Sequence, residues 1–129
     1  MVIDTSALLA LLFNEPEAED FRTALELDET RLVSAATLLE AAIVIEARKG
    51  EVAGRELDRF IDKAAIAVVN VDAEQVEEAR RAWRRFGRGR HEAALNYGDL
   101  FAYALSRTTG EAVLFKGDDF RRTDVARVI

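Results

Sequence analysis

Short runs rich in β-branched residues alternate along the chain with segments whose apolar residues recur every three or four positions. This alternation is typical of βα units, which build a mainly parallel sheet covered by helices. The β-rich runs predict four strands, at residues 2–4, 31–34, 65–71 and 112–115. The helical segments predict six helices, at residues 5–13, 17–27, 35–48, 52–64, 76–86 and 98–109. We therefore expect one α/β domain over residues 1–129, with a turn and a short edge strand at its end.

The composition fits a compact domain and restricts its chemistry. Of the 129 residues, 50% are apolar and 33% charged, with one proline, one histidine and no cysteine. The lack of cysteine excludes a disulfide framework, a thiolate zinc site and a cysteine nucleophile. A metal ion would therefore bind to oxygen atoms or to the single histidine. The first apolar run meets Asn14 and Pro16 well short of the roughly 20 residues of a membrane span, so we expect a cytoplasmic protein with no membrane association.

The net charge of −6 hides a segregated distribution. Residues 80–91, the arginine arm, contain six arginines and no acidic residue, so this segment carries +6 and the remaining chain −12. Such asymmetry favours a polyanionic or acidic partner, although a solvated helix face is the simpler alternative. We interpret Trp83 and Phe86 within the arm as core residues rather than base-stacking platforms. His91 is a weak candidate for a general acid.

Several aspartates stand where a parallel sheet binds ligands, at the carboxyl ends of its strands. Asp4 directly follows the first predicted strand and precedes a helix, and Asp118 and Asp119 follow the last strand. Each position has a structural alternative, because aspartate is common both as a helix N-cap and in turns.

Glu40 is harder to explain by structure alone. It shares a predicted helix face with four apolar residues, so it should point toward the sheet. Burial of an unpaired carboxylate is expensive, and the usual remedies are a partner charge, a metal ion or a raised pKa. A distant arginine is the structural alternative. The apolar residues of that face are Ala36, Ile43, Val44 and Ala47.

Asp99 begins an otherwise apolar helix, where the helix dipole favours an acid and Asn96 is a candidate cap. Together with Glu40 and the aspartates at the strand ends, it completes a set that can converge on one point. Three or four converging carboxylates with no balancing base form a hard-oxygen site for Mg²⁺ or Mn²⁺. Without metal such carboxylates repel one another, which predicts raised pKa values.

Four segments of the chain resemble, in order, the four acidic motifs of the PIN-domain family, and more narrowly those of VapC-type toxins. They are VIDTSALLALL, SAATLLEAAIVI, NYGDLFAYALS and VLFKGDDFRRTDV. The resemblance implies a PIN-like α/β/α sandwich with a central, mainly parallel sheet. It also implies an endoribonuclease that depends on Mg²⁺ or Mn²⁺, in which a metal-activated water attacks the RNA phosphodiester.

Carried over to this sequence, the resemblance assigns the site residue by residue. Asp4, Glu40 and Asp99 match the three best-defined acidic positions, with Asp4 and Asp99 as metal ligands. The remaining assignments are Thr5 and Ser6 as the supporting polar pair, and either Asp118 or Asp119 as the fourth acid.

The resemblance further implies an RNA substrate, a cognate antitoxin and a homodimer. The helices at 17–27 and 35–48 are candidate walls of the antitoxin groove. The arginine arm is then expected to contact the RNA backbone, with antitoxin contact as the second interpretation. The arginines assigned to RNA are Arg84, Arg85, Arg88 and Arg90.

Three other interpretations fit parts of the pattern. A receiver domain also has acids at strand ends and a lysine after its last strand, as Lys116 would be, but the extra acid beside the first strand is lacking. A phosphatase of the haloacid dehalogenase type needs a second aspartate two residues after Asp4, where Ser6 stands. A non-catalytic module with the PIN fold predicts missing acids, and none is missing.

Overall fold

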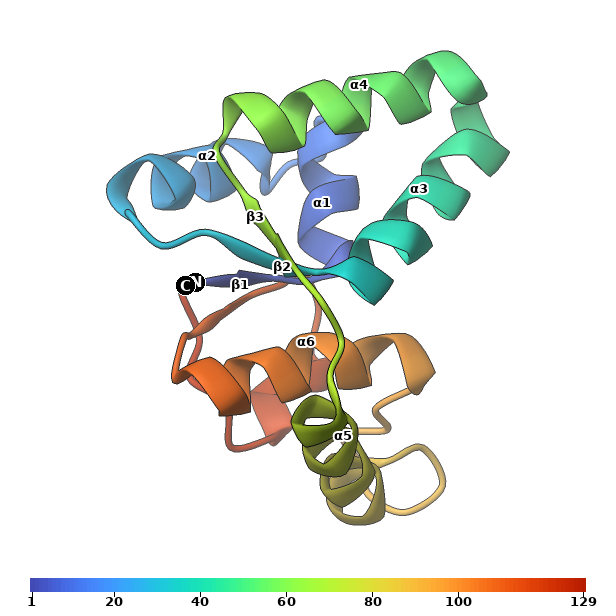
Figure 1. Ribbon diagram of the computed structural model, residues 1–129, viewed down its shortest axis with the longest axis vertical. Helices are drawn as coiled ribbons and strands as arrows, with labels where there is room; N and C mark the ends of the chain where they lie inside the picture. Colours follow the sequence, from blue (N-terminus) through green and yellow to red (C-terminus); the bar gives the residue numbers. More distant parts are fainter.

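The computed structural model describes all 129 residues and has a four-stranded sheet between two layers of helices (Figure 1). The strands lie in the order β3-β2-β1-β4, and every neighbouring pair is parallel. The expected α/β/α sandwich is thus confirmed. The strands are β1 (Val2–Ile3), β2 (Leu32–Ser34), β3 (Ala67–Val69) and β4 (Val113–Leu114).

Four helices cover one face of the sheet and two cover the other (Figure 1). The first face carries α1 (Thr5–Leu12), α2 (Ala18–Leu27), α3 (Ala35–Lys49) and α4 (Glu51–Lys63). The second face carries α5 (Ala73–Phe86) and α6 (Tyr97–Thr109). None of these helices combines the length and the apolar character that a bilayer crossing requires.

Side chains that alternate along the strands fill two separate cores. In β1, Val2 packs with residues of α5 and α6, whereas Ile3 packs with residues of α1 to α4. In β4, Val113 and Leu114 divide in the same way between the two clusters. Because neighbouring residues of a strand point to opposite faces, a sheet covered on both sides needs such continuously apolar strands.

Three predicted elements differ from the structure by more than one residue at an end. The strand predicted at 65–71 is only the edge strand β3, because Ala65 adopts a left-handed turn with φ of 51°. Helix α5 begins three residues before its expected start, since Asp72 caps it by accepting a hydrogen bond from the Gln75 amide. The expected edge strand near the end is instead a 3₁₀ helix (Asp119–Arg122) followed by an isolated bridge between Val113 and Arg127.

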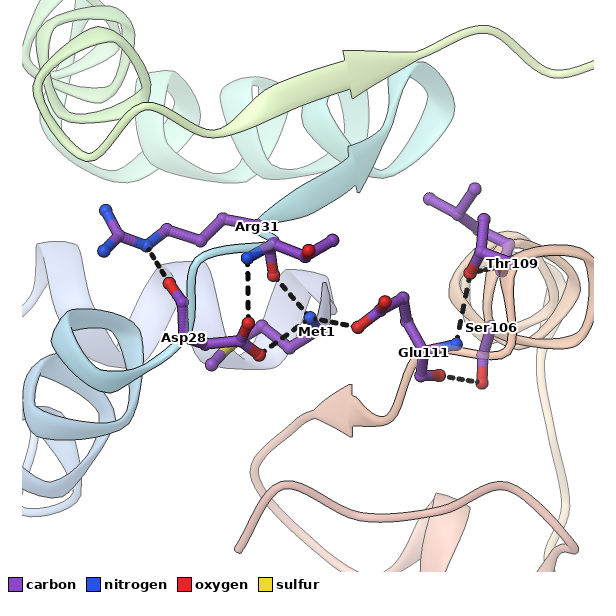
Figure 2. Close-up of polar contacts among 8 residues, drawn as sticks. Met1, Asp28, Arg31, Ser106, Thr109 and Glu111 are labelled. Atoms are coloured by element: carbon purple, nitrogen blue, oxygen red, sulfur yellow. Dashed lines mark hydrogen bonds and ion pairs between the residues drawn. The ribbon is translucent and has the colours of Figure 1, made fainter.

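At the amino ends of the strands, the α-amino group of Met1 joins several segments of the chain (Figure 2). This group donates to Asp28 Oδ2 at 2.9 Å, to Glu111 Oε2 at 2.7 Å and to the Thr30 carbonyl. The ammonium holds the pKa of Asp28 below its ordinary value, chiefly through the direct hydrogen bond. One buried cation thus joins β1 to the loops that precede β2 and β4.

Candidate active site

Asp4 stands at the carboxyl end of β1 and is almost completely buried, with 4% of its surface exposed. It is the N-cap of α1, because Oδ2 accepts from the Ser6 amide at 3.0 Å and from Ser6 Oγ at 2.6 Å. Ser6 Oγ in turn accepts from the Lys116 amide just after β4. The other carboxylate oxygen, Oδ1, is buried without any hydrogen-bond partner. Asp4 therefore caps α1 with one carboxylate oxygen, while its second oxygen stays unpaired.

Ser34, at the end of β2, occupies the position next to Asp4 on the neighbouring strand and was not predicted from the sequence as a site residue. Val2 and Leu32 are paired in the sheet, so Asp4 and Ser34, two residues further along, occupy neighbouring positions. The Ser34 hydroxyl is fully buried and also has no partner. A buried polar group without a partner is rare and calls for a ligand, ion or water. The signal in the sequence was a polar residue at the end of a short strand.

Glu40 lies on α3, but the predicted helix face is wrong. The buried stripe of α3 is Thr37, Ala41 and Ile45, whereas Ile43 is 59% exposed. Helix α3 has apolar residues on most of its sides, so their periodicity alone did not identify the face that packs against the rest of the protein.

Glu40 itself is half-buried at the border of that stripe, and its partner is a hydroxyl rather than the distant arginine that was the alternative. Thr5 Oγ1 donates to Glu40 Oε1 at 2.5 Å. Thr5 is the first residue of α1, so this bond links Glu40 to the residue next to Asp4.

Asp99 lies in the first turn of α6 and forms a capping box with Asn96, as the sequence suggested for the cap. Its Oδ2 accepts from the Asn96 amide at 2.9 Å, and the Asn96 Oδ1 accepts from the Asp99 amide at 3.0 Å. Because these bonds use only Oδ2, the Asp99 carboxylate resembles that of Asp4 in having one oxygen uncommitted.

The two aspartates after β4 differ in their surroundings. The side chain of Asp118 is 80% exposed, and its Oδ1 lies 3.4 Å from Arg121 Nε. Asp119 starts the 3₁₀ helix, and its negative charge raises the pKa of Asp99. Of the two residues that the sequence left open, Asp119 is thus the one that interacts electrostatically with the other acids.

The pKa values show that these carboxylates act on one another. Burial raises the pKa of Asp4 to about 6, and the charge of Glu40 adds to the effect. Burial also raises the pKa of Asp99 to about 7, with further contributions from Asp4, Asp119 and Glu40. No cation is among the causes of either shift. Mutual repulsion of carboxylates predicts shifts in this direction.

The donor atoms suit a hard divalent cation, although they are not drawn together around one point. No three histidine or acidic side chains stand close enough together to hold an ion as they are. The buried, unpartnered Oδ1 of Asp4 and the oxygen-only donor set nevertheless match what Mg²⁺ and Mn²⁺ prefer. The chemistry of the donor set therefore fits such an ion.

Lys116, which the receiver interpretation would place at the phosphoryl site, turns away from the acids. Its Nζ pairs with Glu15 Oε2 and lies 3.3 Å from Glu17 Oε2. The lysine therefore neutralises two glutamates near the start of α2 and is not a partner of Asp4.

Half of the arginine arm is already paired within the protein. Arg80 and Arg81 form ion pairs with Glu77 and Glu78, one helical turn earlier on α5. Arg85 Nη1 lies 3.0 Å from Asp124 Oδ2, and its guanidinium stacks over Phe86. Glu77 and Glu78 lie just before the 80–91 window and Asp124 lies far along the chain, which is why the segment looked unbalanced in the sequence.

The remaining arm arginines, Arg84, Arg88 and Arg90, have no carboxylate partner. Arg90 stacks on the Trp83 ring, 4.2 Å from its centroid. The prediction of Trp83 as a core residue is wrong, because it is 44% exposed, whereas Phe86 is buried as expected. Trp83 instead lines an open apolar groove between α5 and α6, beside Val76, Ala79 and Leu100.

His91 takes part in local structure. Its Nδ1 accepts a hydrogen bond from the Ala93 amide, and its ring packs edge-on against Phe86. These contacts fix the loop after α5, so His91 is not a member of the acidic site.

Comparison with known sequences finds the PIN domain across residues 1–126. Ribonuclease VapC30 of Mycobacterium tuberculosis is 56% identical over 128 residues, which cover 99% of this chain and 98% of that protein. A ribonuclease VapC of Mycolicibacterium smegmatis is also 56% identical and covers 99% of both chains.

Solved structures with the same fold have much lower sequence identity. A crystal structure of M. tuberculosis VapC20, a toxin that cleaves the sarcin-ricin loop, matches 97% of this chain and 95% of its own, with a TM-score of 0.78 at 18% identity. A crystal structure of VapBC2 from Rickettsia felis, bound to a DNA fragment from their promoter, matches 98% and 94% with a TM-score of 0.79 at 15% identity.

Proposed function

The chain belongs to the PIN-domain family as a VapC-type endoribonuclease toxin, and we propose that it cleaves RNA with a divalent metal ion, Mg²⁺ or Mn²⁺, held by Asp4 and Asp99. The observation that carries this proposal is the buried, unpartnered Oδ1 of Asp4 among carboxylates that raise one another's pKa. A fold-stabilising role alone gives no reason to leave that oxygen unpaired. A divalent ion supplies the positive charge that this arrangement lacks.

When bound, such an ion stabilises negative charge on a phosphate oxygen and lowers the pKa of a coordinated water. Ser6 keeps the Asp4 carboxylate oriented, because it donates twice to Oδ2 and so leaves Oδ1 directed elsewhere. Asn96 orients Asp99 in the same way through the capping box.

Glu40 is the proposed group that orients the attacking water and accepts its proton, while the phosphorus–oxygen bond to the leaving group breaks. The Thr5 hydroxyl fixes the Glu40 carboxylate through Oε1, which leaves Oε2 for this role. Asp119 is the proposed fourth acid, which is supported by its charge coupling to Asp99, whereas Asp118 pairs with Arg121.

The test of the site is RNA cleavage by Asp99→Asn, with Asp58→Asn as the matched control. Asp58 is an exposed acid on α4, a helix that carries none of the acids of the proposed site. Asp99→Asn keeps the size of the side chain and should lose most cleavage in Mg²⁺, as should the wild type in a chelator. Asp58→Asn should cleave normally. A folded Asp99→Asn protein with wild-type turnover would refute the metal assignment.

The fourth acid is tested by the pair Asp118→Asn and Asp119→Asn. Both are exposed aspartates of one turn, so the two substitutions are chemically the same. We expect a larger loss of turnover from Asp119→Asn. The reverse order would assign the role to Asp118 instead.

The RNA backbone is proposed to contact the arginine arm. Of the four arginines assigned from the sequence, Arg84 and Arg88 are exposed and have no carboxylate partner, which supports a role in binding phosphate. Arg90 is stacked on Trp83, and Arg85 is paired with Asp124.

The proposed partners are a cognate antitoxin, bound between α2 and α3, and a second copy of the chain. Large apolar side chains stand exposed on α3 and α6, including Leu39, Ile43 and Tyr97, and support an interface there. We propose the cytoplasm as the place of action, where RNA substrates are available. Sedimentation at micromolar concentration tests the homodimer, and a strict monomer would argue against it.

A further inference from the structure

Gly98 is the second residue of α6, between Tyr97 and Asp99. Glycine inside a helix costs about 1 kcal/mol relative to alanine, so its presence there calls for a reason. Its backbone conformation gives none, since Gly98 is not among the glycines with positive φ. The reason is steric, because a Cβ atom at this position would lie 2.1 Å from Glu40 Oε2 and 2.8 Å from Glu40 Cδ.

The Glu40 carboxylate is thereby confined from two sides. Thr5 Oγ1, on α1, donates to Oε1, and the bare backbone of Gly98, on α6, makes room for Oε2. Glu40 itself comes from α3, so three helices meet at one carboxylate. Only a residue without a side chain lets Glu40 extend this far toward the first turn of α6, where Asp99 is the next residue.

We propose that Gly98 is a positioning residue for Glu40, and that its missing side chain sets where the Glu40 carboxylate stands relative to Asp99. The inference rests on the proposed function, in which Glu40 orients the attacking water. Gly98 touches no reacting atom in this proposal and acts only through Glu40.

The substitution Gly98→Ala tests the idea because it adds a single methyl group. The carboxylate would have to retreat by at least about 1 Å to reach an ordinary contact distance. A glutamate side chain is flexible enough to do so without unfolding the protein, but the retreat moves the Glu40 carboxylate away from the first turn of α6. Misplacement by about 1 Å typically costs up to 100-fold in rate, so we expect kcat to fall about 10- to 100-fold.

The chain contains a matched control at Gly54, the fourth residue of α4. A Cβ atom there would lie 2.2 Å from Oε1 of Glu46, which is another glutamate of α3. Gly54→Ala thus adds the same methyl group to a helix, against the same kind of carboxylate from the same neighbouring helix. Glu46 is exposed and has no part in the proposed site, so kcat should be unchanged.

The experiment compares wild type, Gly98→Ala, Glu40→Ala, the double variant and Gly54→Ala on a short RNA substrate at saturating Mg²⁺. We expect Gly98→Ala to lower kcat with KM within about twofold of wild type, and Glu40→Ala to lower kcat at least as much. The double variant should match Glu40→Ala, because truncation of Glu40 also removes the clash. Gly54→Ala should behave as wild type.

A readout independent of turnover is the ¹³C carboxyl resonance of Glu40, assigned by its loss in Glu40→Ala. It should shift in Gly98→Ala and stay in place in Gly54→Ala. Should Gly98→Ala be unstable, the double variant should recover the melting temperature of Glu40→Ala, since the clash is then gone.

The outcomes separate this inference from the proposed function. Wild-type kcat in Gly98→Ala beside an impaired Glu40→Ala would overturn the inference alone. The inference would also fail if the losses of kcat from the two single substitutions added up in the double variant. It would fail as well if Glu40→Ala did not relieve an instability caused by Gly98→Ala. In both cases Gly98 would act independently of Glu40. Wild-type kcat in Glu40→Ala would instead refute the role of Glu40 in the proposed function.

Discussion

Replacement of Asp4 by asparagine should stabilise the metal-free protein at neutral and alkaline pH. The change keeps the shape of the side chain and lets one oxygen still accept from Ser6, but it removes a charge that is buried without a cation. Asparagine caps helices about as well as aspartate, so the substitution should leave the N-cap of α1 intact. The predicted stabilisation follows only if burial of the ionised Asp4 carboxylate lowers the stability of the folded protein.

The pKa gives the size of that cost. Burial raises the pKa of Asp4 from 3.8 to about 6, so the folded protein binds more protons than the unfolded chain between these values. Stability therefore falls as pH rises through this window, and the full cost, about 3 kcal/mol, is present above pH 6. An asparagine amide left unpaired at the Oδ1 position would cost about 1–2 kcal/mol in return. The expected net gain is about 1–2 kcal/mol.

For a domain of this size, that gain corresponds to roughly 3–8 °C in melting temperature. The assay is thermal unfolding with chelator at pH 8 and at pH 5, with Asp58→Asn as the exposed control. Asp4→Asn should melt higher than wild type at pH 8, and the advantage should shrink to near zero at pH 5, which lies inside this window, because only about half of the cost of the buried charge is present there. A lower melting temperature of Asp4→Asn at pH 8 would refute the reasoning, because the cap would then outweigh the buried charge.

Three further predictions concern the metal, the sheet edge and the arm. Saturating Mg²⁺ should raise the melting temperature of wild type by mass action and that of Asp99→Asn much less; equal shifts in thermal melts would argue against Asp99 as a ligand. In urea unfolding at pH 7, Asp28→Asn should lower the free energy of unfolding by about 1–2 kcal/mol. Well below pH 3.8 the substitution should cost nothing, because the lowered pKa of Asp28 means that its contribution to stability is lost as pH falls. Equal costs at both pH values would contradict the ion pair between Asp28 and the Met1 ammonium. In a catalytically dead background, Arg84→Gln with Arg88→Gln should lower the slope of log affinity for single-stranded RNA against log salt by about 0.7 per lost phosphate contact. Arg85→Gln should change this slope much less, because Arg85 is already paired with Asp124. An unchanged slope in the double variant would place the RNA elsewhere.

The sequence predicted the strands and helices well where one signal dominated. Apolar runs ended by Asp4 and the cap pattern of Asn96 and Asp99 correspond to real element boundaries. Prediction failed where two faces of a helix were both apolar, as around Glu40 on α3. Periodicity shows that a helix has an apolar stripe, but it does not show which stripe packs against the sheet. It failed again for Trp83, because helical spacing does not show whether the groove between α5 and α6 that this residue lines is filled or open.

The site itself was predictable in its acids but not in the geometry between them. Carboxylates at strand ends can be found in a sequence, because a parallel sheet brings those ends together. The Thr5–Glu40 bond and the space over Gly98 depend on how α1, α3 and α6 pack, which no local pattern contains. The choice between Asp118 and Asp119 likewise depends on which side of one turn faces α6.

Buried charge is compensated at the amino ends of the strands, here called the amino edge, but not at their carboxyl ends, the carboxyl edge. This contrast connects the fold to the chemistry. At the amino edge, the Met1 ammonium is matched by Asp28 and Glu111, so the buried charge is compensated within the chain. At the carboxyl edge, Asp4 and Asp99 each use one oxygen to cap a helix, and the causes of their raised pKa values include no cation. Because the helix caps prevent these side chains from turning away to solvent, the folded chain holds the uncompensated charge in place. The energy of folding thus maintains an anionic site whose stability increases when a cation binds.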